Sequence, residues 1–290
     1  MTSISLILFS ATAPAVHINN MTLDWHIKMA GRGFPLVLLH GLGASSFSWR
    51  ENIGSLSQHF QVLAPDLPGH GRTSPDVVAD FRLETLTREL LHLLDEHGVA
   101  RAALAGNSLG GSLALLLARQ CPERFPALVL LAPGAALKRA PLIFYPLRLP
   151  LLGPALAALL GPWTARAALH LSYYHKELIT PEVVAGYATT FRTLAQRLAL
   201  RRLACQIDYW PLSRVDALLR QVRQPICLIW GERDRILPVG QAGWLKERLP
   251  QAELHLLPGV GHAPQEEVPE LVNKIIIAFL ARSLKNYYEH

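Results

Sequence analysis

The chain has 290 residues, of which 50% are hydrophobic and 17% are charged, and its mean hydropathy is +0.22. This composition excludes a mainly disordered chain, because disordered segments are poor in apolar residues and rich in charge. Lys and Arg outnumber Asp and Glu by 28 to 22, which gives a formal net charge of +6. A basic surface of this kind suits nucleic acid, anionic lipid or an acidic substrate, and the charge balance alone does not choose among them.

The cysteines and the apolar segments of the sequence indicate the cellular compartment of the protein. Cys121, Cys205 and Cys227 are too few and too far apart for a disulfide framework or a paired zinc site, so we expect a reducing, cytoplasmic location. Residues 3–15 form a short apolar segment that ends in small residues, but no Lys or Arg precedes it. We therefore expect an edge β-strand there rather than a secretory signal peptide. No run of about 18 uninterrupted apolar residues occurs elsewhere, so no membrane span is expected.

Strand and helix patterns alternate in the first part of the chain. Apolar runs and alternating residues predict β-strands at 23–29, 35–39, 60–64, 102–104 and 127–131. Leucines at spacings of three and four predict a helix over 81–97, which Gly98 ends, and a second helix is predicted over 109–119. This alternation predicts a parallel sheet with crossover helices.

The character of the sequence changes after Pro133. The following residues are helical in pattern, rich in Leu, Ala and Arg, and contain no convincing strand. Strand patterns return at 226–230 and 253–257, and helices are predicted over 239–248 and 268–282. We therefore predict an α/β core, with a mostly parallel central β-sheet flanked by helices, and an inserted helical cap. The core comprises residues 1–133 and 215–290, and the cap comprises residues 134–214.

The pentapeptide Gly106-Asn107-Ser108-Leu109-Gly110 matches G-x-S-x-G and lies between a predicted strand and a predicted helix. Glycines on both sides remove side chains that would clash in a sharp strand-to-helix turn. The turn can therefore hold Ser108 in a strained conformation with its hydroxyl exposed. A tight turn with a capping serine is the alternative. The flanking strand and helix favour a nucleophilic serine.

A nucleophilic serine needs a base, and a neutral imidazole oriented by a carboxylate is the usual solution. Asp234 and His262 each follow one of the last two predicted strands. With Ser108 the chain order is Ser, Asp, His, and all three lie at the carboxyl ends of predicted parallel strands, where open α/β sheets bind ligands. Glu232 is the nearest rival acid. Asp234 taken alone is also compatible with an ion pair to a neighbouring arginine or with a helix cap.

The segment His40-Gly41-Leu42-Gly43 follows the strand predicted at 35–39, and its glycines allow the backbone to approach a bound substrate closely. We expect the backbone amides of Leu42 and Leu109 to form an oxyanion hole for a tetrahedral intermediate. Each such donor contributes about 3 to 4 kcal/mol in the transition state. His40 is interpreted as bracing this loop rather than as a catalytic base.

Together these motifs make the chain resemble the α/β-hydrolase superfamily over essentially its whole length. The matching stretches are HGLG at 40–43, DLPGHGRT at 66–73, GNSLGG at 106–111, GERD at 231–234 and GVGH at 259–262. The resemblance implies Ser108 as nucleophile, His262 as base and Asp234 as the residue that orients the base. It also implies the Leu42 and Leu109 amides as oxyanion hole, and a purely structural turn at residues 66–73.

The serine at position 108 disfavours the branches of the superfamily that use an aspartate nucleophile, the haloalkane dehalogenases and the epoxide hydrolases. Within the serine branch, GNSLGG and residues 177–187 resemble the meta-cleavage product hydrolases, which cut carbon–carbon bonds. The chain departs from that group in the residues that follow Gly43, at Tyr187, near which the group carries a cap arginine, and at Ala263, where it carries an aromatic residue. We therefore expect a carboxylesterase or a lipase-like enzyme, with carbon–carbon cleavage as the alternative.

Other function classes have little support in the sequence. Ser46 stands where G-x-G-x-x-G would need its third glycine, and neither a P-loop motif nor HExxH occurs. We expect no cofactor, no metal ion and no nucleic-acid partner. The leucine stripe Leu113, Leu115, Leu116 and Leu117 is interpreted as helix core rather than as part of a ligand site. A non-catalytic binding protein with the hydrolase fold is the alternative from a different class.

The basic excess is concentrated in the predicted cap. Residues 134–214 hold ten Lys or Arg and three Asp or Glu, a net charge of +7, whereas the remainder carries 18 against 19. We expect a small apolar ester or a related carbonyl compound as substrate, and the apolar cap predicts either an acyl tunnel or packing on the core. The basic and apolar composition of the cap also predicts a peripheral membrane contact. There Arg192, Arg197, Arg201 or Arg202 would meet anionic lipid or an acidic substrate, with solvated helix faces as the alternative.

Overall fold

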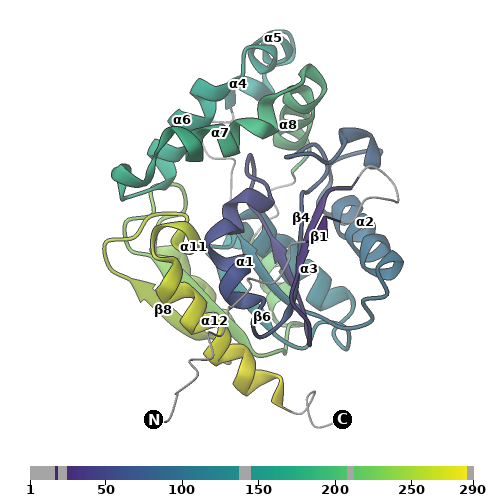
Figure 1. Ribbon diagram of the computed structural model, residues 1–290, viewed down its shortest axis with the longest axis vertical. Helices are drawn as coiled ribbons and strands as arrows, with labels where there is room; N and C mark the ends of the chain where they lie inside the picture. Colours follow the sequence, from purple (N-terminus) through teal and green to yellow (C-terminus); the bar gives the residue numbers. More distant parts are fainter. Residues whose placement is uncertain (1–16, 19–24, 137–144, 208–211, 286–290) are drawn as a thin grey trace, which may run out of the picture.

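The computed structural model describes residues 17–18, 25–136, 145–207 and 212–285, and it has helices on both faces of a central β-sheet (Figure 1). Within these residues the sheet has eight strands in the order β1-β2-β4-β3-β5-β6-β7-β8. The pairs β1–β2 and β2–β4 are antiparallel, and the other neighbouring strands are parallel. The prediction of a mostly parallel sheet flanked by helices is therefore confirmed. The strands are β1 (His17–Ile18), β2 (Ile27–Ala30), β3 (Pro35–Leu39), β4 (Gln61–Pro65), β5 (Ala103–Asn107), β6 (Leu128–Leu131), β7 (Ile226–Gly231) and β8 (Glu253–Leu257).

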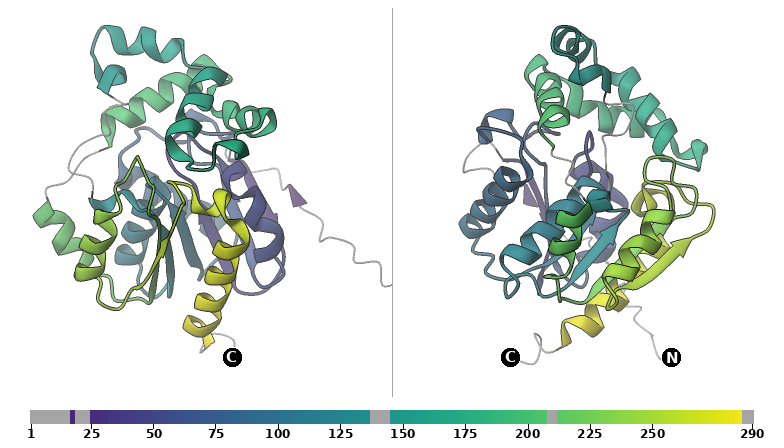
Figure 2. Two further views of the ribbon diagram at one scale, coloured as in Figure 1. Left: turned by 90° about the vertical axis from the view of Figure 1, so that its left-hand side faces the viewer. Right: turned by 180° about the vertical axis from the view of Figure 1, so that it is seen from behind.

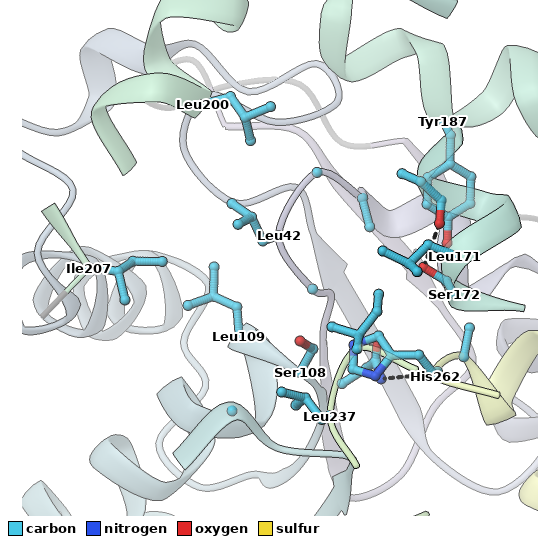
Figure 3. Close-up of a pocket in the computed structure, with 18 of the residues that line it drawn as sticks. Leu42, Ser108, Leu109, Leu171, Ser172, Tyr187, Leu200, Ile207, Leu237 and His262 are labelled. Atoms are coloured by element: carbon cyan, nitrogen blue, oxygen red, sulfur yellow. Dashed lines mark hydrogen bonds between the residues drawn. The ribbon is translucent and has the colours of Figure 1, made fainter. Parts of the chain in front are cut away.

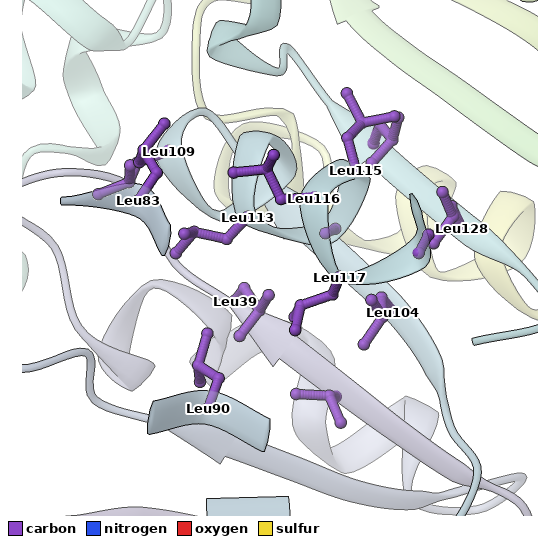
Figure 4. Packing of buried hydrophobic residues seen from close by; sticks show 14 of the residues in the cluster. Leu39, Leu83, Leu90, Leu104, Leu109, Leu113, Leu115, Leu116, Leu117 and Leu128 are labelled. Carbon is purple, nitrogen blue, oxygen red and sulfur yellow. The ribbon is translucent and has the colours of Figure 1, made fainter. Parts of the chain in front are cut away.

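Successive side chains of each strand reach opposite faces of the sheet. In β6, Leu128 and Leu130 pack in one buried cluster, whereas Val129 and Leu131 pack in another. The first cluster joins the sheet to α2 (Leu83–Glu96), α3 (Leu109–Gln120), α9 (Leu212–Leu219) and α10 (Gly240–Arg248), and Figure 4 shows part of it. The second joins the sheet to α1 (Arg50–Leu56) and α12 (Pro269–Ser283). The central strands are apolar on both sides because helices cover both faces.

Helix α2 illustrates how leucine spacing produces this packing. Leu83, Leu86 and Leu90 are buried in the first cluster, and burial of each such side chain contributes about 1.5–3 kcal/mol. Leu93 is also buried, whereas Leu91 is only partly buried. The difference follows from the helical period of 3.6 residues, which places Leu93, three residues after Leu90, on the face toward the sheet.

The described residues between β6 and α9 are helical. Their helices are α4 (Tyr145–Arg148), α5 (Leu152–Ala158), α6 (Pro162–Ser172), α7 (Pro181–Ala188) and α8 (Leu194–Gln206), with 3-10 turns η3 (Gly134–Ala136), η5 (Lys176–Leu178) and η6 (Thr189–Phe191). We refer to α4–α8 as the cap helices, and Figures 1 and 2 show them gathered beyond one end of the sheet. The shorter elements elsewhere are η1 (Ser46–Trp49), η2 (Pro75–Val77) and α11 (Pro264–Glu267). None of the described helices is long and apolar enough to cross a membrane.

Two strands differ from their predicted bounds by more than one residue. Strand β5 ends at Asn107 rather than at Leu104, because Gly106 and Asn107 continue the parallel ladder with β6. The longer strand brings the chain directly to residue 108. Strand β2 begins at Ile27, and the start of the strand predicted at 23–29 lies outside the described residues, as does the segment 3–15.

Candidate active site

Ser108 lies in a sharp turn between β5 and α3 and has φ 54 and ψ −111. Holding the backbone of a residue other than glycine in this left-handed region costs of order 1–3 kcal/mol of folding free energy, so the surrounding structure must hold the turn in place. The flanking glycines permit this sharp turn because they have no Cβ atom. A Cβ on Gly106 would lie 2.4 Å from the backbone of Gly110, and a Cβ on Gly110 would lie 2.1 Å from the carbonyl oxygen of Leu39. The backbone is therefore packed as tightly around Ser108 as the sequence motif predicts.

His262 and Asp234 are brought together from the loops that follow β8 and β7. The buried His262 Nδ1 donates to Asp234 Oδ2 at 2.7 Å. The other carboxylate oxygen, Oδ1, accepts from the backbone amides of Ile236 and Leu237, each at 2.8 Å. These partners fix the carboxylate, so the ion pair with a neighbouring arginine, which Asp234 alone would allow, is not its role here. The bond leaves Nε2 of His262 as the nitrogen available for chemistry.

The loop of His262 is held from two sides. Its backbone amide donates to the carbonyl of Ser172 at the end of cap helix α6, at 2.7 Å. The side-chain amide of Asn107 donates to the carbonyl of His262 and to that of Leu131, each at 3.1 Å. Asn107 therefore ties the loop of the histidine to the strand that carries Ser108. Sequence reasoning assigned no role to this residue, and its only signal was an amide side chain at a variable position of the G-x-S-x-G motif.

One cavity of about 780 Å³ joins the predicted residues. Ser108 and His262 line it together with Leu42 and Leu109 (Figure 3), and Asp234 contacts His262 from outside the cavity wall. The sequence-predicted residues thus converge on a single site. Its walls come from both the loops at the carboxyl ends of β3, β5, β7 and β8 and from the cap helices.

The cavity wall is mainly apolar. Among the described residues that line it, Arg235 is the only Asp, Glu, Lys or Arg. Leu115 and Leu116 of α3 border the cavity as well as packing in the core, which corrects the interpretation of this leucine stripe as core alone. The stripe serves both purposes because α3 begins directly after Ser108 and its first two turns contribute to the cavity wall.

The two backbone segments predicted to supply oxyanion donors lie next to Ser108. Leu109 is the first residue of α3, so its amide has no carbonyl partner within the helix. The loop that carries Leu42 passes close to the serine, because a Cβ on Gly41 would lie 3.2 Å from Ser108 Cβ. Gly43 adopts φ 76, which turns the chain away at this point. An oxyanion hole made by these two amides stays a prediction.

His40 is buried and uses both ring nitrogens on the backbone. Nδ1 donates to the carbonyl of Gly41 and Nε2 accepts from the amide of Leu67, each at 2.8 Å. Burial lowers the pKa of His40, which keeps the ring neutral and fits this tautomer. The contacts support the interpretation of His40 as a brace between the loop at 40–43 and the turn at 66–73.

Asp66 organises the turn at 66–73. Its carboxylate accepts from the amide of Ser46 at 2.7 Å and from that of Arg72 at 2.9 Å, and His26 Nδ1 lies 3.0 Å from Oδ2. Burial would raise the pKa of Asp66, but the contacts with His26 and the two amides lower it to about 2. The ionised carboxylate and its hydrogen bonds fit a structural role for this turn.

A buried polar cluster that the sequence did not reveal lies beside the loop of His262. Glu266 accepts a hydrogen bond from Arg50 on one carboxylate oxygen and from the Tyr187 hydroxyl on the other. Burial raises the pKa of Glu266, while the charge of Arg50 acts in the opposite direction. Because Tyr187 belongs to cap helix α7 and also lines the cavity, the cluster links the cap to the core next to the candidate site.

Replacing Glu266 by glutamine is expected to destabilise the protein by about 3 kcal/mol. This value is at the low end for a broken buried ion pair, because 20% of the Arg50 side chain is exposed to solvent. Chemical denaturation followed by circular dichroism measures this loss. The double variant Glu266→Gln with Arg50→Met is the control, since it removes both charges and is expected to recover part of the stability. A loss in the double variant equal to the sum of the losses in Glu266→Gln and Arg50→Met alone would show that the two side chains are not coupled.

Three of the four cap arginines predicted to meet lipid or substrate donate to backbone carbonyls, and their contact with lipid or substrate stays a prediction. The acceptors are Phe191 and Ala158 for Arg197, Leu149 for Arg201 and Ala79 for Arg202. Their first role is therefore to hold the cap helices together and to the core. Arg192 is exposed.

The chain belongs to the α/β-hydrolase fold family, whose model matches residues 35–269. It is 33% identical over 254 residues to the pimeloyl-[acyl-carrier protein] methyl ester esterase of Nitrosomonas europaea, covering 84% of this chain and 95% of that protein. It is 30% identical over 285 residues to the 2-hydroxy-6-oxo-6-phenylhexa-2,4-dienoate hydrolase of Burkholderia cepacia, covering 94% and 97%.

A solved structure shows the same fold. The α/β hydrolase fold protein from Burkholderia ambifaria superposes with a TM-score of 0.77 at 25% identity, over 90% of this chain and 99% of that one. The family and the hydrolase relatives support an enzyme that acts on a small-molecule substrate.

Proposed function

We propose that the protein is a serine hydrolase that cleaves a carboxylic ester through Ser108, His262 and Asp234. The observation that carries the proposal is the convergence on one cavity of a strained, accessible serine and a histidine whose Nδ1 is fixed by a buried carboxylate. These are the parts that nucleophilic catalysis at a carbonyl requires. The esterase relative, with 33% identity, supports the same chemistry.

In the proposed acylation step, Ser108 Oγ attacks the carbonyl carbon of the ester while Nε2 of His262 accepts the hydroxyl proton. Asp234 holds the imidazole in the tautomer that carries its proton on Nδ1, and it stabilises the imidazolium that forms. The amides of Leu42 and Leu109 would stabilise the negative charge on the carbonyl oxygen. His262 then protonates the leaving alcohol, and an acyl group stays on Ser108.

The deacylation step repeats the sequence with water as nucleophile. His262 takes a proton from water, the hydroxide adds to the acyl carbon, and the second tetrahedral intermediate collapses to release the carboxylic acid and to return the proton to Ser108. No atom beyond the ester and one water is needed, so the residues of the cavity suffice for the whole cycle.

The cavity favours a neutral substrate with an apolar acyl or alcohol group. Leucines and alanines from the core and the cap helices make up most of its wall. An apolar chain buried there gains about 0.8 kcal/mol for each methylene group. We propose that residues 134–214 act as the cap that sets chain length, supported by the cavity wall that the cap helices contribute.

Carbon–carbon cleavage of a ring-fission product is the second candidate. Arg235 lines the cavity and offers a cation to a carboxylate substrate, and one relative at 30% identity is named as a dienoate hydrolase. The ester is preferred because Arg235 is exposed and the rest of the wall is mainly apolar. A non-catalytic binding protein is the third outcome that the experiment below separates.

A panel of p-nitrophenyl esters of increasing acyl length tests the proposal, with Ser108→Ala as blank. We expect wild-type hydrolysis of several esters, with kcat/KM rising with chain length until the cavity is filled, and a rate for Ser108→Ala that is lower by roughly 10⁴-fold or more. A vinylogous 1,5-diketone acid is assayed in parallel. Cleavage of the diketone without cleavage of any ester would favour the carbon–carbon reaction, and binding of esters without turnover would favour a binding protein.

A further inference from the structure

The outer face of the cap helices α4–α6 is apolar and exposed. Leu151 has 90% of its surface accessible, Leu152 62%, Leu159 68% and Trp163 63%. Leu149 and Leu156 extend the same surface, and we refer to these six residues as the apolar cap surface. Leu152 and Leu156 belong to α5, Leu149 and Leu151 lie between α4 and α5, and Leu159 and Trp163 lie between the end of α5 and the first turn of α6. Such a concentration of large exposed side chains is unusual for a face in contact only with water.

The charge around the apolar cap surface is of one sign. The sequence contains no Asp or Glu between Glu123 and Glu177, a stretch that includes all three helices. Arg148 and Arg166 are exposed on α4 and α6, and Arg201 of α8 donates to the carbonyl of Leu149. An apolar face with a Trp and several leucines, bordered by arginines and free of acids, has the composition of a helix that lies in the interface of an anionic bilayer.

The apolar cap surface is continuous with the cavity. Leu156, Leu159 and Trp163 are exposed on the outside and also line the cavity that holds Ser108. A chain that rises from a bilayer would therefore pass along apolar side chains from the surface to the serine, without crossing water. Figure 1 shows α4 and α5 at the far side of the cap from the sheet, where a flat surface can reach them, whereas α6 lies closer to the core.

We propose that the apolar cap surface docks on an anionic lipid bilayer. The leucines and Trp163 enter the boundary between headgroups and acyl chains, and the arginines remain level with the lipid phosphates. The docking surface itself does not depend on the chemistry at Ser108. Delivery of a bilayer-dissolved ester into the cavity rests on the proposed function.

Vesicle sedimentation tests the docking without turnover, using Ser108→Ala protein throughout. Vesicles of phosphatidylglycerol mixed with phosphatidylcholine are compared with vesicles of phosphatidylcholine alone. We expect binding to the anionic vesicles, and a decrease in the partition coefficient of about tenfold or more when Leu151 and Leu152 are both replaced by glutamine. Neither residue lines the cavity. The matched control is Leu271→Gln on α12 of the core, a leucine with 46% exposure, which is expected to leave binding unchanged.

Two further measurements keep the test independent of folding. Brominated lipids are expected to quench tryptophan fluorescence in the otherwise intact protein, and Trp163→Phe is expected to remove most of that quenching. Arg166→Gln is expected to weaken binding to anionic vesicles and to leave the weaker binding to neutral vesicles unchanged.

Equal binding of the double leucine variant and its parent would overturn the proposal. So would a dimer of the parent protein, seen by analytical ultracentrifugation, that becomes a monomer in the double variant, because a second copy would then cover the surface. Failure of ester hydrolysis with vesicle binding intact would contradict the proposed function and leave the docking surface in place.

Discussion

Replacing Ser108 by alanine is expected to remove ester hydrolysis, with a decrease in kcat of roughly 10⁴- to 10⁶-fold. The alanine retains the Cβ atom that packs in the turn but has no hydroxyl to form the acyl-enzyme. The two candidate oxyanion amides stay in place, so the residual rate comes from these donors and from substrate binding in the same cavity. Steady-state hydrolysis of the best p-nitrophenyl ester, combined with phosphonate labelling of the serine, measures both the rate and the covalent step.

Ser112→Ala is the matched control for this substitution. Ser112 also lines the cavity, one helical turn after Ser108, and its hydroxyl donates to the carbonyl of Ser108 at 3.4 Å. That long hydrogen bond is worth about 1 kcal/mol at most, so we expect less than about a tenfold change in kcat. A large loss of kcat in Ser112→Ala, together with normal activity in Ser108→Ala, would show that Ser108 is not the nucleophile.

The parts of the site that the sequence could predict are those that need unusual residues close together in the chain. Ser108 needs a positive φ with two close backbone approaches, and only glycines at 106 and 110 allow them. The fold was predictable for a related reason, because strands covered on both faces are continuous apolar runs and the helices between them have leucines at helical spacing. Each of these signals is local.

The parts that the sequence did not predict depend on contacts between distant residues. Arg50 and Glu266 are separated by 216 positions, and each has an ordinary surface alternative when considered alone. The same holds for Asn107, whose side chain reaches the carbonyl of His262 across 155 positions. The cap arginines were assigned to the entrance from net charge alone. Charge counts do not show that nearby backbone carbonyls take up the guanidinium groups of Arg197 and Arg202.

Replacing Asp234 by asparagine is expected to lower kcat by about 10⁴-fold while leaving the fold intact. The side-chain oxygen of asparagine can still accept hydrogen bonds from the backbone amides of Ile236 and Leu237. Its NH₂ group would then face His262 Nδ1, which now donates to the carboxylate at 2.7 Å. Two donors cannot share that bond, so the imidazole is forced to carry its proton on Nε2, where it can no longer accept the proton of Ser108.

Glu232→Gln is the control for Asp234→Asn, because Glu232 is the other acid of the same loop and is exposed. We expect its kcat to stay within about twofold of the wild type, since an exposed charge at this distance is screened by water. The double variant Ser108→Ala with Asp234→Asn is expected to be no slower than Ser108→Ala alone. Residues that act as one unit lose their effect together, so the carboxylate contributes nothing once the hydroxyl is gone. Additive losses in the double variant would instead mean that Asp234 acts on the rate by a path that does not pass through Ser108.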